Sequence, residues 1–275
     1  MRIVTDTASL YSPEQGRELG IEVVPACAII DGQVYRDYED ISSEEFLRKI
    51  QEGAVPTTSQ PSVGDFMEVF EGQEEVLFLS IGDGLSGGYQ NAMGVRSMMG
   101  QGERIHVVDT KTLAGPQHYL VEKAVRLKEQ GLSAKEIKQE LAQSIDHSVS
   151  FVIPADFEFL KRSGRLIPLA AKIGSMIKIV PVMTQTEDMR RIRPFVITRS
   201  KKKAVEAIIG HLKSMGVDRE YVISVAHAGV LDQAEAVKEQ LRTHFADTKI
   251  ELYALSPALI THGGPGSITI QAVHK

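Results

Sequence analysis

A single hydroxyl side chain, Ser86, lies among glycines where the sequence predicts that a strand gives way to a helix. The segment Gly84-Leu85-Ser86-Gly87-Gly88 follows the apolar run Val76 to Ile81 and precedes a helical pattern from Tyr89 to Met99. Glycines let the backbone approach a ligand closely, and the N–H groups at a helix N-terminus attract anions. These residues therefore predict an oxyanion site, with Ser86 as hydroxyl donor and the amide of Gly87 beside it.

The same segment also fits a different chemistry, because Gly84-x-Ser86-x-Gly88 matches the nucleophile elbow of serine hydrolases. A triad would need an acid and a base later in the chain. Asp109 or Asp156, followed by His262, supplies the order Ser, Asp, His. An esterase with Ser86 as the nucleophile is therefore the alternative to a site that binds a carboxylate without turnover.

A second group of small hydroxyl side chains lies upstream, in Pro56-Thr57-Thr58-Ser59-Gln60-Pro61-Ser62. Its two prolines disfavour helix and favour an extended or turned backbone. The segment fits either a polar turn or a second set of donors to the same anion.

These segments resemble, in order, the motifs of the DegV family of fatty-acid-binding proteins. The resemblance runs over nearly the whole chain and rests on Ile3 to Leu10, Tyr35 to Asp37, Thr57 to Ser62, Leu85 to Gln90, Val107 to Thr110, Phe159 to Arg165 and His262 to Gly266. The chain departs from the family pattern at Gly88, where Thr is usual, and at Ser163, where a second Gly is usual beside Gly164. The first departure leaves one hydroxyl fewer for the ligand.

The resemblance implies a protein that binds a long-chain fatty acid and is not itself a catalyst. Thr58, Ser86 and Gly87 would hold the carboxylate, with Arg165 and His262 nearby to support transfer. The family presents the carboxylate to a separate ATP-dependent kinase subunit, which makes an acyl phosphate for phospholipid synthesis. The sequence contains no Walker-type glycine loop, which agrees with ATP being handled by that partner.

An acyl tail needs an apolar pocket, and an apolar stretch follows Arg165 directly. It comprises Leu166, Ile167, Leu169, Ala170, Ile173, Met176, Ile177 and Ile179. Packing in a core explains this stretch as well as contact with a tail does. Arg165 itself fits either a position near the carboxylate or an ion pair between domains.

The elements that must position these residues alternate between strand and helix in the first half of the chain. This pattern predicts a parallel sheet covered by helices, with ligands beyond the carboxyl ends of the strands. The predicted elements are Ile3 to Asp6, Pro13 to Leu19, Ile21 to Ile30, Ser43 to Glu52, Val76 to Ile81, Tyr89 to Met99, Ile105 to Asp109, Pro116 to Gln130 and, with a capping box from Ser133 to Glu136, Ser133 to Ser148.

The pattern changes near residue 150, where we predict a boundary between an N-terminal domain, residues 1–150, and a C-terminal domain, residues 151–275. Later predicted strands are the apolar segment Phe151 to Pro154, Ile179 to Thr184, Ile192 to Thr198, Tyr221 to His227 and Ile250 to Leu255, with helices at Lys201 to Met215 and Leu231 to Thr243. With the resemblance, the expected fold is α/β: an N-terminal three-layer α/β/α domain with a mainly parallel sheet, and a C-terminal two-layer domain with a mixed sheet that contributes the acyl-chain pocket.

Composition narrows the range of partners. The 275 residues carry a net charge of −5, which does not favour nucleic acid or an anionic membrane surface. We find no apolar run long enough to span a membrane and no signal-peptide pattern, so we expect a cytoplasmic protein and leave open only transient membrane contact. Cys27 is the only cysteine, and the histidines show no metal-ligand spacing, so no metal is expected. The basic stretch Arg190 to Lys203 favours a solvated face over DNA binding.

Overall fold

A parallel sheet of four strands forms the N-terminal part of the computed structural model, which describes residues 1–100, 102–168, 170 and 179–275. The strands lie in the order β2-β1-β6-β7, and all neighbours are parallel. Their bounds are Arg2–Asp6 for β1, Glu22–Val24 for β2, Val76–Ser80 for β6 and Ile105–Asp109 for β7. The carboxyl ends of these strands therefore lie along one edge, as the sequence predicted.

Helices cover both faces of this sheet, so its strands are buried on both sides. Along β6, Leu77 and Leu79 pack against α5 and α6, whereas Val76 and Phe78 pack against α3 and α4. The helices have the bounds Pro13–Glu18 for α1, which lies beside β2, Val63–Phe70 for α3, Gly88–Met98 for α4, Gly115–Glu129 for α5 and Ala134–Asp146 for α6. The three-layer arrangement and the capping box of Ser133 are confirmed.

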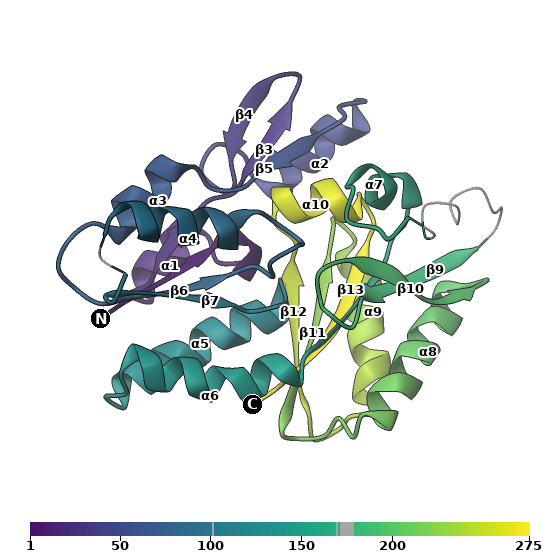
Figure 1. The fold of residues 1–275 in the computed structure, drawn as a ribbon. Helices are drawn as coiled ribbons and strands as arrows, with labels where there is room; N and C mark the ends of the chain where they lie inside the picture. Colours follow the sequence, from purple (N-terminus) through teal and green to yellow (C-terminus); the bar gives the residue numbers. More distant parts are fainter. Residues whose placement is uncertain (101, 169, 171–178) are drawn as a thin grey trace.

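A small antiparallel sheet, in the order β4-β3-β5, projects beyond the main sheet (Figure 1). It contains β3 (Cys27–Ile30), β4 (Gln33–Arg36) and β5 (Thr57–Ser59), and the helix α2 (Ser43–Gln51) lies between β4 and β5 in the chain. The prediction of one continuous element from Ile21 to Ile30 is therefore wrong. Pro25 has no N–H for a ladder, and the chain leaves the parallel sheet there and enters the second one.

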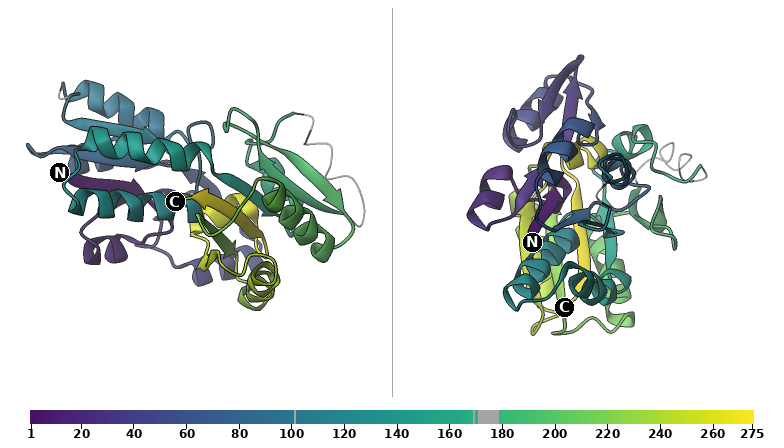
Figure 2. Two further views of the ribbon diagram at one scale, coloured as in Figure 1. Left: turned by 90° about the horizontal axis from the view of Figure 1, so that it is seen from below. Right: turned by 60° about the vertical axis from the view of Figure 1, so that its left-hand side comes forward.

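The C-terminal part contains a mixed sheet of six strands in the order β10-β9-β8-β13-β11-β12. Their bounds are Val149–Ile153 for β8, Val180–Gln185 for β9, Ile192–Thr198 for β10, Tyr221–His227 for β11, Lys249–Ala254 for β12 and Ile268–His274 for β13. The helices α8 (Lys201–Ser214) and α9 (Leu231–Arg242) cover one face. The other face turns towards the N-terminal part, and Figures 1 and 2 show the two sheets side by side.

The sequence analysis missed a strand at the centre of this sheet. β13 pairs with both β8 and β11, and its residues alternate between the two faces. Ile268 and Ile270 enter the core beneath α8 and α9, whereas Thr269 and Gln271 face the opposite side. This alternation from Ser267 to Gln271 is the period-two signal of a half-buried strand. The short helices α7 (Phe157–Arg162) and α10 (Pro257–Gly263), like α3, were also missed.

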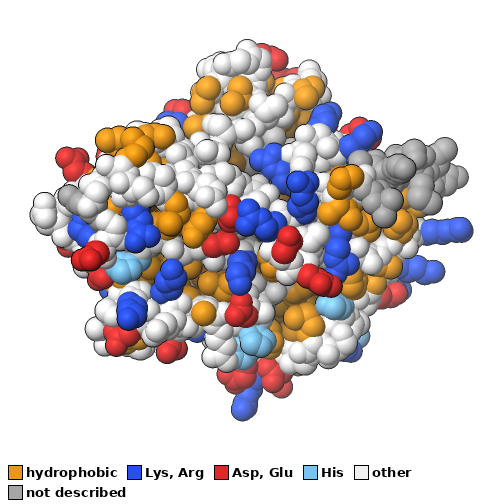
Figure 3. Space-filling view, viewed as in Figure 1, with side chains coloured by type: hydrophobic (Ala, Val, Ile, Leu, Met, Phe, Trp, Pro, Cys, Tyr) orange, Lys and Arg blue, Asp and Glu red, His pale blue; other side chains and the backbone are white. Residues whose placement is uncertain are grey.

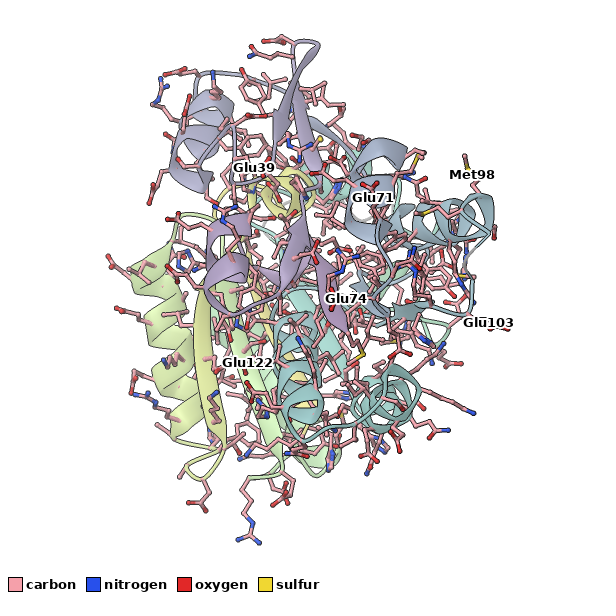
Figure 4. All side chains as sticks on the ribbon, turned by 90° about the vertical axis from the view of Figure 1, so that its left-hand side faces the viewer. Glu39, Glu71, Glu74, Met98, Glu103 and Glu122 are labelled. Atoms are coloured by element: carbon pink, nitrogen blue, oxygen red, sulfur yellow. The ribbon has the colours of Figure 1, made fainter. Side chains whose placement is uncertain are left out.

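Helices of each part pack on elements of the other part. α5 packs on β11 and β13, and α10 packs on α2 and β3. On α5, His118 stacks on Tyr11 with 3.9 Å between ring centroids and approaches Tyr253 of β12 at 4.7 Å. Figure 4 shows Glu122 on the side of α5 that faces β12. Because helices of one part pack on strands and helices of the other, the division into two domains near residue 150 stays a prediction.

Candidate functional site

Ser86 lies in the loop between β6 and α4, directly before the N-terminus of α4. The N–H of Gly88 donates to Ser86 Oγ over 3.4 Å, which uses the hydroxyl as an acceptor and leaves its proton available to a ligand. Gly87 is the N-cap of α4 and makes no side-chain cap hydrogen bond. The predicted geometry, a hydroxyl beside a helix N-terminus, is present at Ser86.

Two glycines of this loop have neighbours so close that a Cβ would collide with them. Gly84 has a φ of +94°, and a Cβ there would lie 2.7 to 2.9 Å from Arg190 atoms. A Cβ on Gly87 would lie 2.2 Å from Oε1 of Gln60. Gly87 therefore makes room for the Gln60 side chain, and it is Gln60, not Gly87, that lines the pocket described below.

Thr58 approaches the same place from β5, where it pairs with Ala28 of β3. Its Oγ1 lies 3.0 Å from Nε2 of His262, at the end of α10. Burial, together with the Arg165 guanidinium, lowers the pKa of His262 to about 3, so its ring is neutral at pH 7. A proton on Nε2 lets His262 donate to Thr58, which frees the Thr58 hydroxyl to donate to a ligand. His262 then acts through Thr58.

Arg165 is a partly buried cation beside this pair. Its Nε donates to the Leu85 carbonyl over 3.1 Å, and its Nη1 donates to the Ser163 carbonyl. Burial lowers the pKa of Arg165. Within the described part of the chain no Asp or Glu forms an ion pair with it, so the alternative of an ion pair between domains is not seen there. A desolvated cation without an acidic partner favours the binding of an anion.

Two cavities meet at these residues. The polar pocket is lined by Thr58, Ser86 and Gln60, among others. The apolar cavity lies between the two sheets and encloses about 810 Å³ of space, part of it open to solvent. Five residues line both: Ile81, Leu85, Arg165, Leu259 and His262. A ligand with an anionic head and an apolar tail matches this arrangement, because one cavity presents hydroxyl and cationic side chains and the other has an almost wholly apolar lining.

Four of the five predicted site residues thus surround one pocket: Thr58, Ser86, Arg165 and His262. Asp6, noted only as a strand end, also lines it. Its carboxylate accepts from the N–H groups of Ala8 and Ile81 and from Gln117, and burial raises its pKa to about 6. These bonds fix the loops that follow β1 and β6.

The predicted apolar stretch contributes little to the cavity wall as far as it is described. Leu169 and residues 171–178 lie outside the described residues. Leu166 and Ala170 are buried in a small core cluster with Leu160 and Met183, against which Ile167 packs. For these described residues the structure agrees with core packing. The cavity wall comes from the strands β8, β9 and β13 together with residues of other segments, among them Leu85, Leu113 and Leu259.

The serine hydrolase alternative lacks its triad among the described residues. His262 Nε2 contacts Thr58, and its Nδ1 has no hydrogen-bond partner. Asp109 accepts from the backbone of Asp83 and Lys111, and Asp156 caps α7. Neither carboxylate orients the imidazole, as a triad requires.

The basic stretch joins the site at one end. Arg190 pairs with Asp83 at 2.7 Å and, with Arg191, lines a third cavity that also touches Gly84 and Arg165. Figure 3 shows Lys and Arg side chains gathered near the middle of this face. The prediction of a solvated face holds for the exposed Arg190 and Arg191, yet this end of the stretch adjoins the anion-binding residues.

Among the described residues, no group of three or more His, Cys, Asp or Glu side chains could hold a metal ion. None of the helices in this part of the chain is both long enough and apolar enough to cross a bilayer.

The neutral state of His262 predicts an acid-sensitive contribution to stability. Its folded pKa of about 3 lies below the ordinary value of 6.5, so the unfolded chain binds a proton first as the pH falls. Relative to His262→Gln, the wild-type free energy of unfolding should therefore decrease from about pH 6.5 to about pH 3, by up to roughly 1.4 kcal/mol per pH unit. Urea unfolding of both proteins across this pH range measures the difference in their free energies of unfolding. Asp6 and Asp37 titrate in both proteins and cancel, and a constant difference between the two would contradict the assignment.

Comparison with known proteins gives a consistent result along the whole chain. The family model described as "Uncharacterised protein, DegV family" matches residues 1–275. A DegV domain-containing protein of Halalkalibacterium halodurans is 31% identical, covering 97% of this chain and 95% of its own length. The structure of a DegV family protein from Thermus thermophilus, described by its fatty acid binding, has a TM-score of 0.89 and 31% identity, with 100% of both chains covered. DegV of Bacillus subtilis, described as a fatty acid binding protein, has a TM-score of 0.87 and 25% identity over 100% of this chain and 99% of its own. The chain therefore belongs to the DegV family.

Proposed function

We propose that this protein binds a long-chain fatty acid, with the carboxylate in the polar pocket and the tail in the apolar cavity. The observation that carries the proposal is Arg165, a partly buried cation at the junction of the two cavities without an ion-pair partner among the described residues. A carboxylate beside it supplies the missing negative charge. The hydroxyls of Ser86 and Thr58 then orient that carboxylate.

The expected energetics assign different roles to the two ends of the ligand. Each buried CH₂ contributes roughly 0.8 kcal/mol, so the tail supplies most of the affinity. A charge-assisted hydrogen bond contributes roughly 1.5–3 kcal/mol, enough for Ser86 and Thr58 to fix the head. The relatives from Thermus thermophilus and Bacillus subtilis, both described as fatty acid binding, support the same ligand class here.

Native mass spectrometry tests the proposal directly. Protein purified without added lipid, and the same protein after incubation with palmitic acid, should carry an adduct of the mass of one fatty acid. Extraction with organic solvent should then release that acid. The absence of any acyl adduct, even after incubation, would refute fatty acid binding.

Removing either hydroxyl should weaken binding without unfolding the protein. We expect Ser86→Ala and Thr58→Ala each to cost roughly 1–3 kcal/mol of binding free energy, because a carboxylate oxygen loses its donor while buried. Thr57→Ala is the matched control, since Thr57 is the exposed neighbour of Thr58 on β5. Isothermal titration with palmitic acid measures the difference. Unchanged affinity in the double variant would place the carboxylate elsewhere.

We propose further that the bound carboxylate is presented to a separate ATP-dependent kinase subunit in the cytoplasm, which converts it to an acyl phosphate for phospholipid synthesis. The support is the third cavity, which opens beside Arg165 and carries Arg190 and Arg191. Arg190 is paired with Asp83, so Arg191 and Arg165 supply the positive charge that favours the approach of an anionic phosphoryl donor. The polar pocket and this cavity share Arg165, so donor and acceptor would meet at one guanidinium.

His262 should matter more for transfer than for binding. It contacts Thr58, so its loss leaves the direct donors in place but loosens the hydroxyl that aims the carboxylate. A displacement of about 1 Å can cost a hundredfold in rate. His262→Ala should bind palmitic acid nearly normally and yet form little acyl phosphate with the kinase subunit and ATP, measured by hydroxamate trapping. The exposed His147→Ala is the control, and equal losses of binding and transfer would make His262 a direct ligand.

A further inference from the structure

The wall of the apolar cavity contains buried polar atoms that have no partner. Gln185 is 7% exposed and Ser267 is 0% exposed, and both line this cavity. Gln185 Oε1 and Ser267 Oγ are among the buried side-chain atoms that make no hydrogen bond within the described structure. Burying a polar atom removes its hydrogen bonds to water, and without a partner in the protein this loss of free energy is not offset. Because both side chains line one cavity, a ligand in that cavity is a candidate partner for both atoms.

The orientation of Gln185 follows from its amide nitrogen. Nε2 donates to the Lys111 carbonyl over 2.8 Å and to the Met189 carbonyl over 3.0 Å, which uses both of its hydrogens. Flipping the amide would set Oε1 against these two carbonyl oxygens, so the oxygen stays on the other side. Gln185 therefore has one unpaired acceptor, its Oε1, and no free donor on its side chain.

Ser267 begins the polar face of β13. Its main chain is satisfied, since its N–H donates to Gly264 and its carbonyl accepts from Ala228, but its hydroxyl has no partner. The next polar residues on this face differ. Thr269 donates to the Ala226 carbonyl at 3.5 Å, and Gln271 donates to Leu113 and Ser150 at 3.0 and 2.8 Å. Away from the junction with the polar pocket, where His262 Nδ1 is also unpaired, the unpaired atoms in the described wall are therefore those of Gln185 and Ser267.

We propose that the apolar cavity is selective for fatty acids whose acyl chain carries a hydroxyl group. A chain hydroxyl would donate to Gln185 Oε1, or exchange a hydrogen bond with Ser267, and so satisfy a group that a plain hydrocarbon leaves unpaired. Sites built to bond a substrate hydroxyl discriminate strongly against analogues that lack it. This inference rests on the proposed function and names the substrate class of the same site.

The test compares stearic acid with a panel of stearic acids that carry one hydroxyl at different chain positions, by isothermal titration. We expect wild-type protein to bind at least one hydroxylated acid about tenfold more tightly than stearic acid. Gln185→Leu or Ser267→Ala should abolish that preference while stearic acid binds as well as before or better. Thr269→Val, which removes a hydroxyl that already has a partner in the same wall, is the matched control and should keep the preference.

Each other outcome has a definite meaning. If wild-type protein binds no hydroxylated acid more tightly than stearic acid, the proposal is overturned, and ordered water is then the partner of both groups. A preference that survives both Gln185→Leu and Ser267→Ala overturns it equally. If neither stearic acid nor any member of the panel binds, fatty acid binding itself has failed, which separates that result from the first two.

Discussion

The desolvated charge of Arg165 is the constraint on which the site depends. Its guanidinium is anchored by carbonyls on both sides, that of Leu85 from the loop after β6 and that of Ser163 from the end of α7. Carbonyl oxygens hold the group in place but do not neutralise it. The described chain supplies no acidic partner for this partly buried charge, and each of the three cavities that share Arg165 gives an anion a way to approach it.

Much of the fold could be predicted because it follows from local patterns. The helices α4, α5, α6, α8 and α9 begin and end within two residues of their predicted bounds, since apolar periodicity and capping residues such as Ser133 mark them. The strand β13 was missed because residues 267 to 271 follow the glycine-rich segment His262 to Gly266, whose composition is typical of a loop. His262 instead ends the short helix α10, and its Nδ1 is buried.

The candidate site could be predicted only in part, for a physical reason. Thr58, Ser86, Arg165 and His262 carry local signals, in hydroxyl-rich or glycine-containing segments, that mark them as candidates one at a time. Their convergence depends on pairing between β3 and β5 and on α10 packing against β3, contacts that no local pattern contains. Gln185 and Ser267 carry no local signal, because an unpaired atom is a property of the folded neighbourhood. Gly87 is a different case. Its residue type marked it as a site residue, whereas in the structure the absence of a Cβ makes room for the Gln60 side chain.

The walls of the apolar cavity come from segments far apart in the chain, from Leu85 and Leu113 on one side and from Met183 and Thr269 on the other. A tail in this space would complete a hydrophobic core that the polypeptide leaves open. Thermodynamic linkage then follows, because a ligand that binds only the folded chain raises the unfolding free energy by RT ln(1 + [L]/Kd). The amount of folded protein in a cell would consequently respond to the supply of ligand, and the apolar cavity would couple the abundance of the protein to the availability of that ligand.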